Sequence, residues 1–308
     1  MSGILVVGSV ALDSVETPFG RVTDTLGGSA VFFSAAASLF TPIRLVGVVG
    51  EDYPLDALDF LVQRGVDLAG LECRSGRSFR WSAVYGYDLN SRETLSTELG
   101  VFADFQPTIP RGFRDARWIF LGNIHPGLQL EVLEQVQRPE FVACDTMNYW
   151  IEGERKALIE LLGRIDMLLV NDAEARELSG SYSLAQAARW IHERGPTYVV
   201  IKKGEHGAIL FSREGIFFAP GYPLEDVFDP TGAGDAFAGG LLGHVARAGS
   251  LHFEEMKRAI VYGCALGSFA CEAFGPERFI DLTGEEVGER VQRFREMTRF
   301  EYPAPVGW

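Results

Sequence analysis

The segment DPTGAGDAFAGG, residues 229–240, places an aspartate directly after three small residues and before an apolar stretch. Small residues let a ligand approach the backbone, and the free N–H groups in the first turn of a helix bind anions such as phosphate. We therefore expect Gly232, Ala233 and Gly234 to form an anion cradle at a helix N-terminus. Asp235 would lie in the first helical turn, where the helix dipole favours its ionised form. Such a carboxylate can accept the proton of a hydroxyl that attacks a phosphoryl group.

Two interpretations of Asp235 are open at this point. For an isolated aspartate, simple capping of the helix would be preferred, because Asp is a common N-cap residue. A catalytic role for Asp235 is favoured by the small residues that precede it. It is also favoured by the glycines at positions 239, 240 and 243, which allow close helix packing.

Short apolar runs recur along the chain and predict strands that are buried on both faces of a sheet. They are Ile4–Val7, Leu45–Val49, Trp118–Leu121, Phe141–Cys144, Met167–Val170 and Tyr198–Ile201. Helix-length segments lie between them, at Ser29–Phe40, Gln129–Gln137, Gly153–Arg164 and Ser183–Glu193. This alternation predicts an α/β fold with a mostly parallel central sheet covered by helices. From Asp235 onward the pattern becomes mainly helical.

Two stretches interrupt the alternation and predict a small β lid on a single domain of residues 1–308. In Phe79–Asp88, aromatic and polar side chains alternate as in a half-exposed strand. Val15–Thr25 has the pattern of a further hairpin. The lid is accordingly assigned to residues 14–26 and 76–104.

The composition is that of an ordinary globular protein, with 47% hydrophobic and 23% charged residues among 308. A formal net charge of −14 argues against nonspecific binding to nucleic acid or to an anionic membrane, which requires clustered Lys and Arg. The start of the chain lacks a basic leader, and no apolar run is long enough to span a membrane, so we expect a cytoplasmic protein. The four cysteines lack the spacing of zinc ligands.

The string DPTGAGDAFAGG resembles, nearly residue for residue, the C-terminal signature of the ribokinase-like (PfkB) family of sugar and nucleoside kinases. The resemblance implies a ribokinase-like three-layer α/β/α fold with a central, mostly parallel sheet and a small β lid. It implies that Asp235 is the catalytic base. The backbone amides of Gly232, Ala233 and Gly234 would then form the anion hole for the γ-phosphoryl group of ATP.

Segments near the N-terminus resemble the part of the family that binds the acceptor. VVGSVALD ends in Asp13, which the resemblance implies is substrate-binding, and Gly27 and Gly28 match a diglycine that lies against the sugar. By themselves the two glycines would indicate a helix-entry turn. Many sugar kinases of the family carry an asparagine where this chain has Phe32, so a ligand ring is expected to stack there. The alternative is that Phe32 belongs to the core of the helix.

The segment DTMNYW, residues 145–150, departs from the family pattern Asp-x-Asn-x-Arg, because the arginine is missing. Phosphorylated or carboxylated sugars typically need an Arg clamp, so the absence favours a neutral substrate. Arg80 and Arg92 in the predicted lid are candidates to compensate, and Arg80 is included among the substrate-binding residues. The alternative is that both are solvated.

Two further segments resemble the nucleotide-binding part of the family. In NDAEARELSG, the counterparts of Asn171 and Glu174 organise the phosphates and a magnesium-bound water. Alone, Asn171 would be interpreted as a helix cap and Glu174 as a solvated helix residue. IKKGEHGA places Lys202 and Gly204 at positions that contact the nucleotide. Some relatives also bind a monovalent cation such as K⁺ near the counterparts of Asp229 and Thr231.

Other classes of function have less support in the sequence. A Walker-type phosphate loop is excluded because no G-x-x-x-x-G-K-[ST] occurs, and a nicotinamide dehydrogenase is disfavoured because no G-x-G-x-x-G follows the first strand. The five histidines have no metal-ligand spacing. A catalytically idle binding or regulatory protein with the same fold would be favoured by loss of the base, but Asp235 is present.

The sequence thus predicts a kinase that uses ATP and Mg²⁺ to phosphorylate a hydroxyl of a small neutral polyol, sugar or nucleoside. The aromatic residues place nucleosides and cyclitols slightly ahead of simple hexoses and pentoses. Lids of this family can also serve as dimer interfaces, and the aromatic face of Phe79–Tyr87 makes a homodimer through the lid an expectation. The sequence specifies neither the individual acceptor nor the preferred phosphoryl donor.

Overall fold

A sheet of nine strands crosses the part of the chain that the computed structural model describes, residues 3–299. The strand order is β13-β12-β11-β10-β9-β8-β1-β4-β5, and all neighbours from β11 to β5 are parallel. β12 and β13 extend one edge in antiparallel fashion. The strands are β1 (Ile4–Val7), β4 (Ile43–Gly50), β5 (Val66–Arg74), β8 (Trp118–Leu121), β9 (Phe141–Asp145), β10 (Met167–Asn171), β11 (Tyr198–Lys202), β12 (Ala208–Ser212) and β13 (Ile216–Ala219). Residues 1–2 and 300–308 of the predicted domain 1–308 lie outside the described residues.

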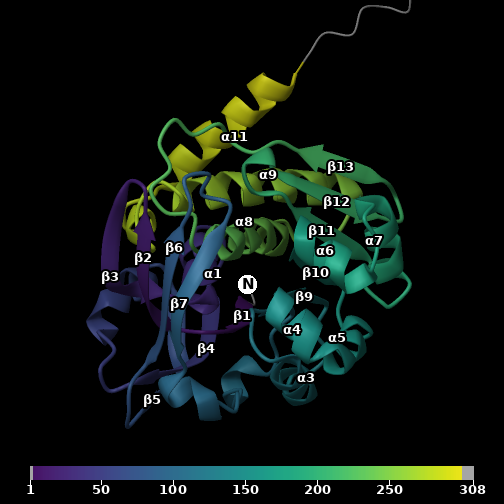
Figure 1. The fold of residues 1–308 in the computed structure, drawn as a ribbon. Coiled ribbons are helices and arrows are strands. Elements are labelled where there is room, and N and C mark those ends of the chain that lie inside the picture. Colours follow the sequence, from purple (N-terminus) through teal and green to yellow (C-terminus); the bar gives the residue numbers. More distant parts are fainter. Residues whose placement is uncertain (1–2, 300–308) are drawn as a thin grey trace, which may run out of the picture.

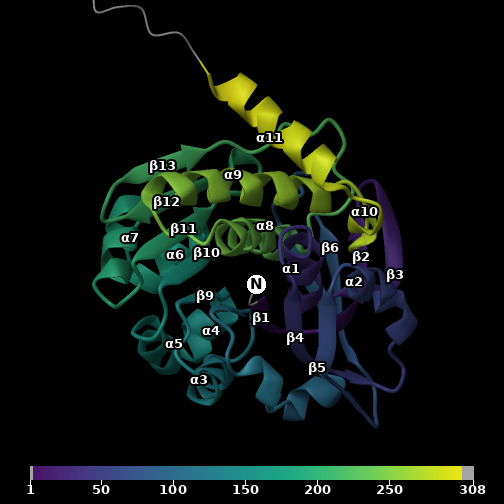
Figure 2. The ribbon, with the colours of Figure 1, turned by 180° about the vertical axis from the view of Figure 1, so that it is seen from behind.

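Helices cover both faces of this sheet, as Figures 1 and 2 show from opposite sides. One face carries α1 (Ser29–Ala37), α8 (Ala233–Ala248) and α9 (Phe253–Ala270), with α10 (Glu277–Ile280) and α11 (Gly284–Thr298) packed on α9. The other face carries α3 (Pro126–Gln135), α4 (Asn148–Gly153), α5 (Arg155–Leu162), α6 (Asp172–Ser179) and α7 (Leu184–His192). The short α2 (Asp59–Gln63) lies beside β5. The result is three layers, with the sheet in the middle.

The buried strands divide their side chains between two cores. In β1, Ile4 and Val6 belong to the core under α1, α8 and α9, whereas Leu5 and Val7 belong to the core on the other face. All four are 0% exposed. Strands that are covered on both faces consist of continuous apolar runs, which explains why the six predicted strands all occur. β5 and β13 were not predicted as strands, because exposed or half-buried positions break their apolar runs. β12 was not predicted either, although Ala208–Phe211 is a continuous buried apolar run.

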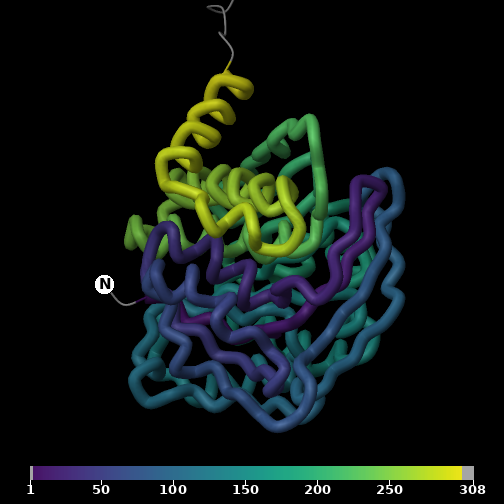
Figure 3. The backbone as a smooth tube through the Cα atoms, turned by 90° about the vertical axis from the view of Figure 1, so that its left-hand side faces the viewer, coloured from purple at the N-terminus to yellow at the C-terminus, as the bar shows by residue number. Residues whose placement is uncertain are grey.

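Four further strands form a small sheet that projects from the body of the molecule, as Figure 3 shows for the purple and blue hairpins. They are β2 (Ala11–Thr17), β3 (Gly20–Gly27), β6 (Phe79–Tyr85) and β7 (Arg92–Glu98), in the order β3-β2-β6-β7. The predicted hairpin at Val15–Thr25 is β2–β3. The connections contain the short 3₁₀ turns η1 (Leu55–Leu58), η2 (Gly100–Asp104), η3 (Arg111–Phe113) and η4 (Gly204–His206).

The aromatic face predicted for Phe79–Tyr87 is only partly exposed. Tyr87 is 88% exposed, but Tyr85 is 7% exposed, and Phe79 stacks on Phe102 with ring centroids 5.3 Å apart. The expectation of one continuous exposed face is therefore wrong, because the end of β6 turns toward the body of the molecule. Within residues 3–299, no helix combines the length and hydropathy that a bilayer-spanning segment requires.

Candidate active site

Three polar side chains stand at the carboxyl ends of neighbouring parallel strands. Asp145 ends β9, Asn171 ends β10 and Lys202 ends β11. Asn171 and Lys202 are also direct partners in the register of β10 and β11. In open parallel sheets ligands bind outside this edge, so these residues mark the candidate site.

The predicted anion cradle lies at the N-terminus of α8. Gly232 is the N-cap residue and has left-handed backbone angles, φ 74° and ψ −3°, which favour glycine. The N–H groups of Gly234 and Asp235 have no protein acceptor among residues 3–299, so both can bind an anion. The Ala233 N–H instead donates to the Pro230 carbonyl at 3.2 Å and closes a turn. Its amide is therefore engaged, contrary to the prediction that it belongs to the anion hole.

Phe32 occupies the core and does not face the acceptor site. It is 1% exposed, and its ring packs directly against Gly232, where a Cβ would lie 2.3 Å from the ring. A ring buried in this way has no free face for a ligand, so the prediction that a substrate stacks on Phe32 is wrong. Phe32 supports the cradle from the core side, and its contact is a second reason for glycine at position 232.

The carboxyl group of Asp235 lies in the first turn of α8. Burial raises its pKa to about 7, the charge of Asp145 contributes to the rise, and the charges of Lys202 and Arg92 oppose it. The helix terminus favours the ionised form of Asp235, as expected from the sequence, but burial outweighs this effect on its pKa. A carboxylate with a pKa near neutrality is well suited to take up a proton during a reaction.

Lys202 supplies a positive charge between the strand ends and the cradle. Its Nζ atom donates to Asp145 Oδ2 at 2.6 Å, and the two side chains are 17% and 6% exposed. Burial lowers the pKa of Lys202, but Asp145 and Glu174 more than offset this effect, so the pKa is raised and the amine stays charged. A Cβ on Gly234 would lie 3.1 Å from Nζ, which places the ammonium beside the cradle.

Asn171 and Glu174 form a capping box at the start of α6. The Glu174 N–H donates to Asn171 Oδ1 at 2.8 Å, and the Asn171 N–H donates to Glu174 Oε2 at 2.7 Å. Burial raises the pKa of Glu174 to about 7, against the opposing charge of Lys202. Asn171 therefore caps helix α6, as the alternative interpretation of the sequence predicted. It leaves Glu174 Oε1 available, so capping and a role in the site are compatible.

Asp13, Gly27 and Gly28 lie together in the small sheet, where β2 begins and β3 ends. Asp13 is 5% exposed, and a Cβ on Gly27 would lie 2.0 Å from its Oδ2 atom. Gly28 is the N-cap of α1 with φ 92°. Burial and the charge of Asp229 raise the pKa of Asp13 to about 7, and a hydrogen bond from the Gly28 backbone opposes the rise.

The small sheet touches both sides of the site. The Tyr85 hydroxyl lies 3.1 Å from Thr231 Oγ1 in the loop before the cradle. At the turn between β6 and β7, Asn90 Nδ2 lies 3.4 Å from Glu205 Oε1, and Asn90 Oδ1 lies close to Gly204. The small sheet therefore contacts the predicted residues Thr231 and Gly204, of which Thr231 is half-buried and Gly204 is exposed.

Arg80 is held by two carboxylates and does not present a free charge. Its Nη1 donates to Asp52 Oδ2 at 2.6 Å, and its Nε donates to Asp24 Oδ1 at 3.2 Å. Burial would raise the pKa of Asp52, but hydrogen bonds from Ser78 and Arg80 lower it to about 2. The prediction that Arg80 binds substrate is corrected accordingly: it ties β6 to β3 and to the turn after β4.

Asp229 organises the loop that leads into the cradle. It is 1% exposed, and its two oxygens accept the N–H groups of Thr231 at 2.8 Å and Gly275 at 3.4 Å. Burial raises its pKa in spite of these bonds.

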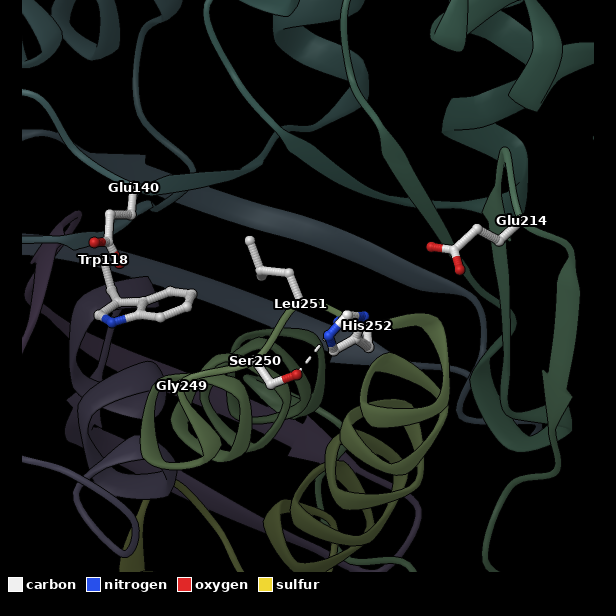
Figure 4. A pocket seen from close by; sticks show the side chains of 7 residues that line it. All are labelled: Trp118, Glu140, Glu214, Gly249, Ser250, Leu251 and His252. Carbon is white, nitrogen blue, oxygen red and sulfur yellow. Dashed lines mark hydrogen bonds between the residues drawn. The ribbon is translucent and has the colours of Figure 1, made fainter.

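A hollow of about 480 Å³ lies at the opposite edge of the sheet (Figure 4). Its lining combines the starts of β8 and β9 with the link between α8 and α9, and the residues are Trp118, Glu140, Glu214, Gly249, Ser250, Leu251 and His252. None of the predicted site residues lies there. This edge holds the amino ends of the parallel strands, so the hollow is separate from the candidate site.

Two charged residues of the site were not assigned to it from the sequence. Asp145 was noted only for its departure from a family pattern, although an acid directly after a buried strand is itself a signal of a strand-end site. Arg92 was named only as one candidate for a missing clamp. Its charge lowers the pKa values of Asp235 and Glu174, so it acts on the site from the small sheet.

A cradle for an anion, a carboxylate of near-neutral pKa beside it, and a buried lysine define a phosphoryl-transfer site. The chain matches the model of the pfkB family of carbohydrate kinases over residues 1–281, and it belongs to this family. It is a phosphotransferase with a hydroxyl group as acceptor.

Similar proteins include the cytidine kinase of Thermococcus kodakarensis, which is 30% identical over 253 residues, 80% of this chain and 90% of that protein. The aminoimidazole riboside kinase of Salmonella typhimurium is 29% identical over 297 residues, 89% of this chain and 91% of that protein. The nucleoside kinase structure of Methanocaldococcus jannaschii, a member of the ribokinase family, superposes with a TM-score of 0.76 at 19% identity, covering 95% of this chain and 99% of that one. The predicted ribokinase-like three-layer α/β/α fold is confirmed.

Proposed function

We propose that this protein transfers the γ-phosphoryl group of ATP to a hydroxyl group of a nucleoside, or of a related small neutral sugar or cyclitol, with Asp235 as general base. The observation that carries the proposal is the position of Asp235. Its carboxyl group, with a pKa of about 7, belongs to the first turn of α8, where the N–H groups of Gly234 and Asp235 have no protein acceptor among residues 3–299. A base and an anion site meet there, as attack of a hydroxyl on a phosphoryl group requires.

In the proposed reaction, Asp13 and the Gly27–Gly28 backbone hold the acceptor. Asp235 takes the proton of the attacking hydroxyl while its oxygen forms a bond to the γ-phosphorus. The bond from that phosphorus to the bridging oxygen breaks, and ADP leaves with the electron pair. The amides of the cradle and the ammonium of Lys202 stabilise the charge on the transferring group.

Magnesium bound with ATP would neutralise phosphate charge during the transfer. Glu174, through its available Oε1 and a bound water, and Asn171 are the residues proposed to orient it. Among residues 3–299 no three His, Cys, Asp or Glu side chains converge into a metal site, which fits an ion held mainly by phosphates and water. Lys202, Gly204 and Thr231 are proposed to contact the nucleotide. A monovalent cation such as K⁺ is proposed near Asp229.

A nucleoside is the preferred acceptor class in this proposal. Two similar proteins are named cytidine kinase and aminoimidazole riboside kinase, and the nucleoside kinase structure of Burkholderia thailandensis, with a TM-score of 0.75 at 22% identity, was obtained with inosine. The ion pairs of Arg80 with Asp52 and Asp24 leave it without a free charge for an anionic acceptor. No observation favours a catalytically idle binding or regulatory protein, because the chain retains Asp235 at the start of α8, the residue proposed as the base.

We further propose that the small sheet, with residues 14–26 and 76–104, acts as a lid. Its contacts to Thr231 and Glu205 would exclude water and limit hydrolysis of ATP. A homodimer through the lid is supported by four exposed apolar side chains within it, Phe19, Tyr87, Leu95 and Leu99. A cytoplasmic location stays a prediction from the sequence.

A coupled assay of ATP turnover tests the proposal. Wild type with Mg²⁺ and K⁺ is supplied with cytidine, inosine, myo-inositol, ribose and fructose, alongside Asp235→Asn and the matched control Asp226→Asn, an exposed aspartate in the preceding loop. We expect turnover that depends on an acceptor, a loss of about 100-fold or more in Asp235→Asn, and wild-type rates in the control. Acceptor-dependent turnover that survives in Asp235→Asn would refute the assignment of the base.

A further inference from the structure

Gln129 is a fully buried amide on α3 that reaches the carboxyl ends of two strands. It is 0% exposed. Its Nε2 atom donates to the Gly122 carbonyl, directly after β8, at 2.8 Å and to the Asp145 carbonyl, at the end of β9, at 3.2 Å. Both neighbours are acceptors, so only the NH₂ end of the amide can lie there. One side chain therefore joins two strand ends at the edge of the sheet where the candidate site lies.

The bonds of Gln129 continue the sheet beyond the last residues that the strands themselves pair. The register between β8 and β9 ends at Leu121 and Cys144. β9 extends one residue further, to Asp145, and β10 still supplies a register partner there, Leu169. Asp145 is thus held by β10 on one side and by the Gln129 amide on the other.

The local structure of α3 does not explain why position 129 carries an amide. The Gln129 Oε1 atom accepts no hydrogen bond from any residue that the structure describes. An unpaired buried oxygen destabilises a fold, and a methionine of similar length would fill the same space without it. The bonds to the two strand ends are the interactions that an apolar side chain cannot make at this position.

The backbone of Asp145 determines where its carboxylate holds Lys202. Asp145 Oδ1 accepts the Thr146 N–H at 2.8 Å, and Oδ2 accepts Lys202 Nζ at 2.6 Å. Because both oxygens are engaged, the carboxylate moves together with the end of β9. A Cβ on Gly234, in the cradle, would lie 3.1 Å from the same Nζ atom. Gln129, Asp145, Lys202 and the cradle therefore form one continuous series of contacts.

We propose that Gln129 is a positioning residue for phosphoryl transfer, which fixes the end of β9 and through Asp145 keeps the ammonium of Lys202 beside the cradle. Gln129 acts through these two residues and not by contact with a substrate. A charge that stabilises the transferring group must be held at a fixed distance, and a displacement of about 1 Å can lower a rate about 100-fold. The inference rests on the proposed function, because that function assigns Lys202 to the transferring group.

The test compares wild type with Gln129→Met, and Gln135→Met is the matched control. Gln135 lies on the same helix and also joins backbone segments, since its Nε2 donates to the Pro107 carbonyl at 2.7 Å and its Oε1 accepts the Ile109 N–H at 3.0 Å. For each protein we measure Tm, the calorimetric Kd of ATP, and the pH dependence of kcat and KM with cytidine and inosine. Should Gln129→Met fail to fold, Gln129→Glu replaces it, because a buried protonated carboxyl group keeps one donor for the two carbonyls.

We expect Gln129→Met to lower kcat about 5- to 50-fold and to change KM for the acceptor less than about twofold. The acidic limb of the kcat/KM profile should move to higher pH, because Lys202 lowers the pKa of Asp235 and does so less from a greater distance. ATP should bind about 3- to 10-fold more weakly. Gln135→Met should also lower Tm, but it should leave kcat, the pH profile and the ATP affinity unchanged.

The effect of Gln129→Met should also depend on Lys202. In a Lys202→Met background the same substitution should lower kcat less than about twofold, because the ammonium that it positions is absent. Equal fold-losses in the two backgrounds, or a lower Tm with unchanged kcat, pH profile and ATP affinity, would overturn the inference.

If wild type phosphorylates neither cytidine nor inosine, the proposed acceptor fails separately from the inference about Gln129. The Kd values of ATP then decide about Gln129. ATP that binds equally to wild type and Gln129→Met overturns the positioning role, and a wild type that binds no ATP overturns both proposals.

Discussion

Replacing Lys202 with methionine should lower both the stability and the activity of this kinase. Lys202 and Asp145 form a largely buried ion pair at 2.6 Å. Removing one partner of such a pair leaves an uncompensated charge, at a cost of about 3–5 kcal/mol. The Lys202 side chain keeps some exposure to solvent, so we expect a loss at the lower end of this range, about 3 kcal/mol. In a chain of 308 residues the corresponding fall in Tm is roughly 4–6 °C.

The same substitution should shift the acid–base behaviour of the site. The pKa of Asp235 is about 7 because burial and the charge of Asp145 raise it, and Lys202 opposes the rise. Without the ammonium we expect this pKa to increase by about one unit. A general base must be deprotonated, so the acidic limb of the kcat/KM profile should move to higher pH by the same amount.

Two further variants separate the electrostatic effect from a packing defect. Asp145→Asn combined with Lys202→Met removes both charges, and it should recover most of the lost stability but not the activity. Lys203→Met changes the neighbouring lysine, which forms no ion pair within residues 3–299, and it should behave as wild type. A Lys202→Met protein with the Tm and pH profile of wild type would refute the reasoning, because it would show that Asp235 does not sense this charge.

Three other substitutions test separate parts of the site. Gly232→Ala should lower the free energy of unfolding in denaturant by about 1–3 kcal/mol and abolish turnover. The reason is that φ at this position is 74° and that a Cβ would lie 2.3 Å from the Phe32 ring. A variant as stable as wild type would contradict this geometry. Tyr85→Phe removes the hydrogen bond between the Tyr85 hydroxyl and Thr231. The rate of ATP hydrolysis without acceptor should then rise about 3- to 5-fold relative to the rate of phosphoryl transfer. An unchanged ratio of the two rates would argue against a lid role of the small sheet. The pKa of Asp235 is raised from 3.8 to about 7, so the folded state binds the extra proton and wild type loses stability as pH rises between these values. The difference in Tm between Asp235→Asn and wild type should therefore be larger at pH 8 than at pH 5. If calorimetric scans give the same difference at both pH values, the Asp235 carboxyl is not buried.

The sequence was sufficient to predict those parts of the site that depend on local pattern. The cradle follows from three small residues before a helix, and the positions of Asn171 and Lys202 follow from buried apolar runs that end at them. Such runs are visible because both faces of the central strands are covered. β5 and β13 escaped prediction because they have half-exposed faces and lack that signal.

The errors concern contacts between segments that are far apart in the sequence. Phe32 has the helical spacing of a core residue and of a ligand contact alike, and only its packing against Gly232 decides between them. The charge of Arg80 is cancelled by Asp24 and Asp52, which lie 56 and 28 positions away. The pKa of Asp235 depends on burial, which a single segment cannot show.

The three acidic groups at the centre of the site have a common energetic consequence. Burial raises the pKa values of Asp13, Glu174 and Asp235 to about 7 in each case. At neutral pH each group is therefore divided between a charged form that lacks solvation and a neutral form that binds a proton. Hydrogen-bond donors and cations favour the charged form, so binding of substrates to these groups lowers their pKa values and releases protons. Binding of ligands to these groups and release of protons from them are then linked in one equilibrium.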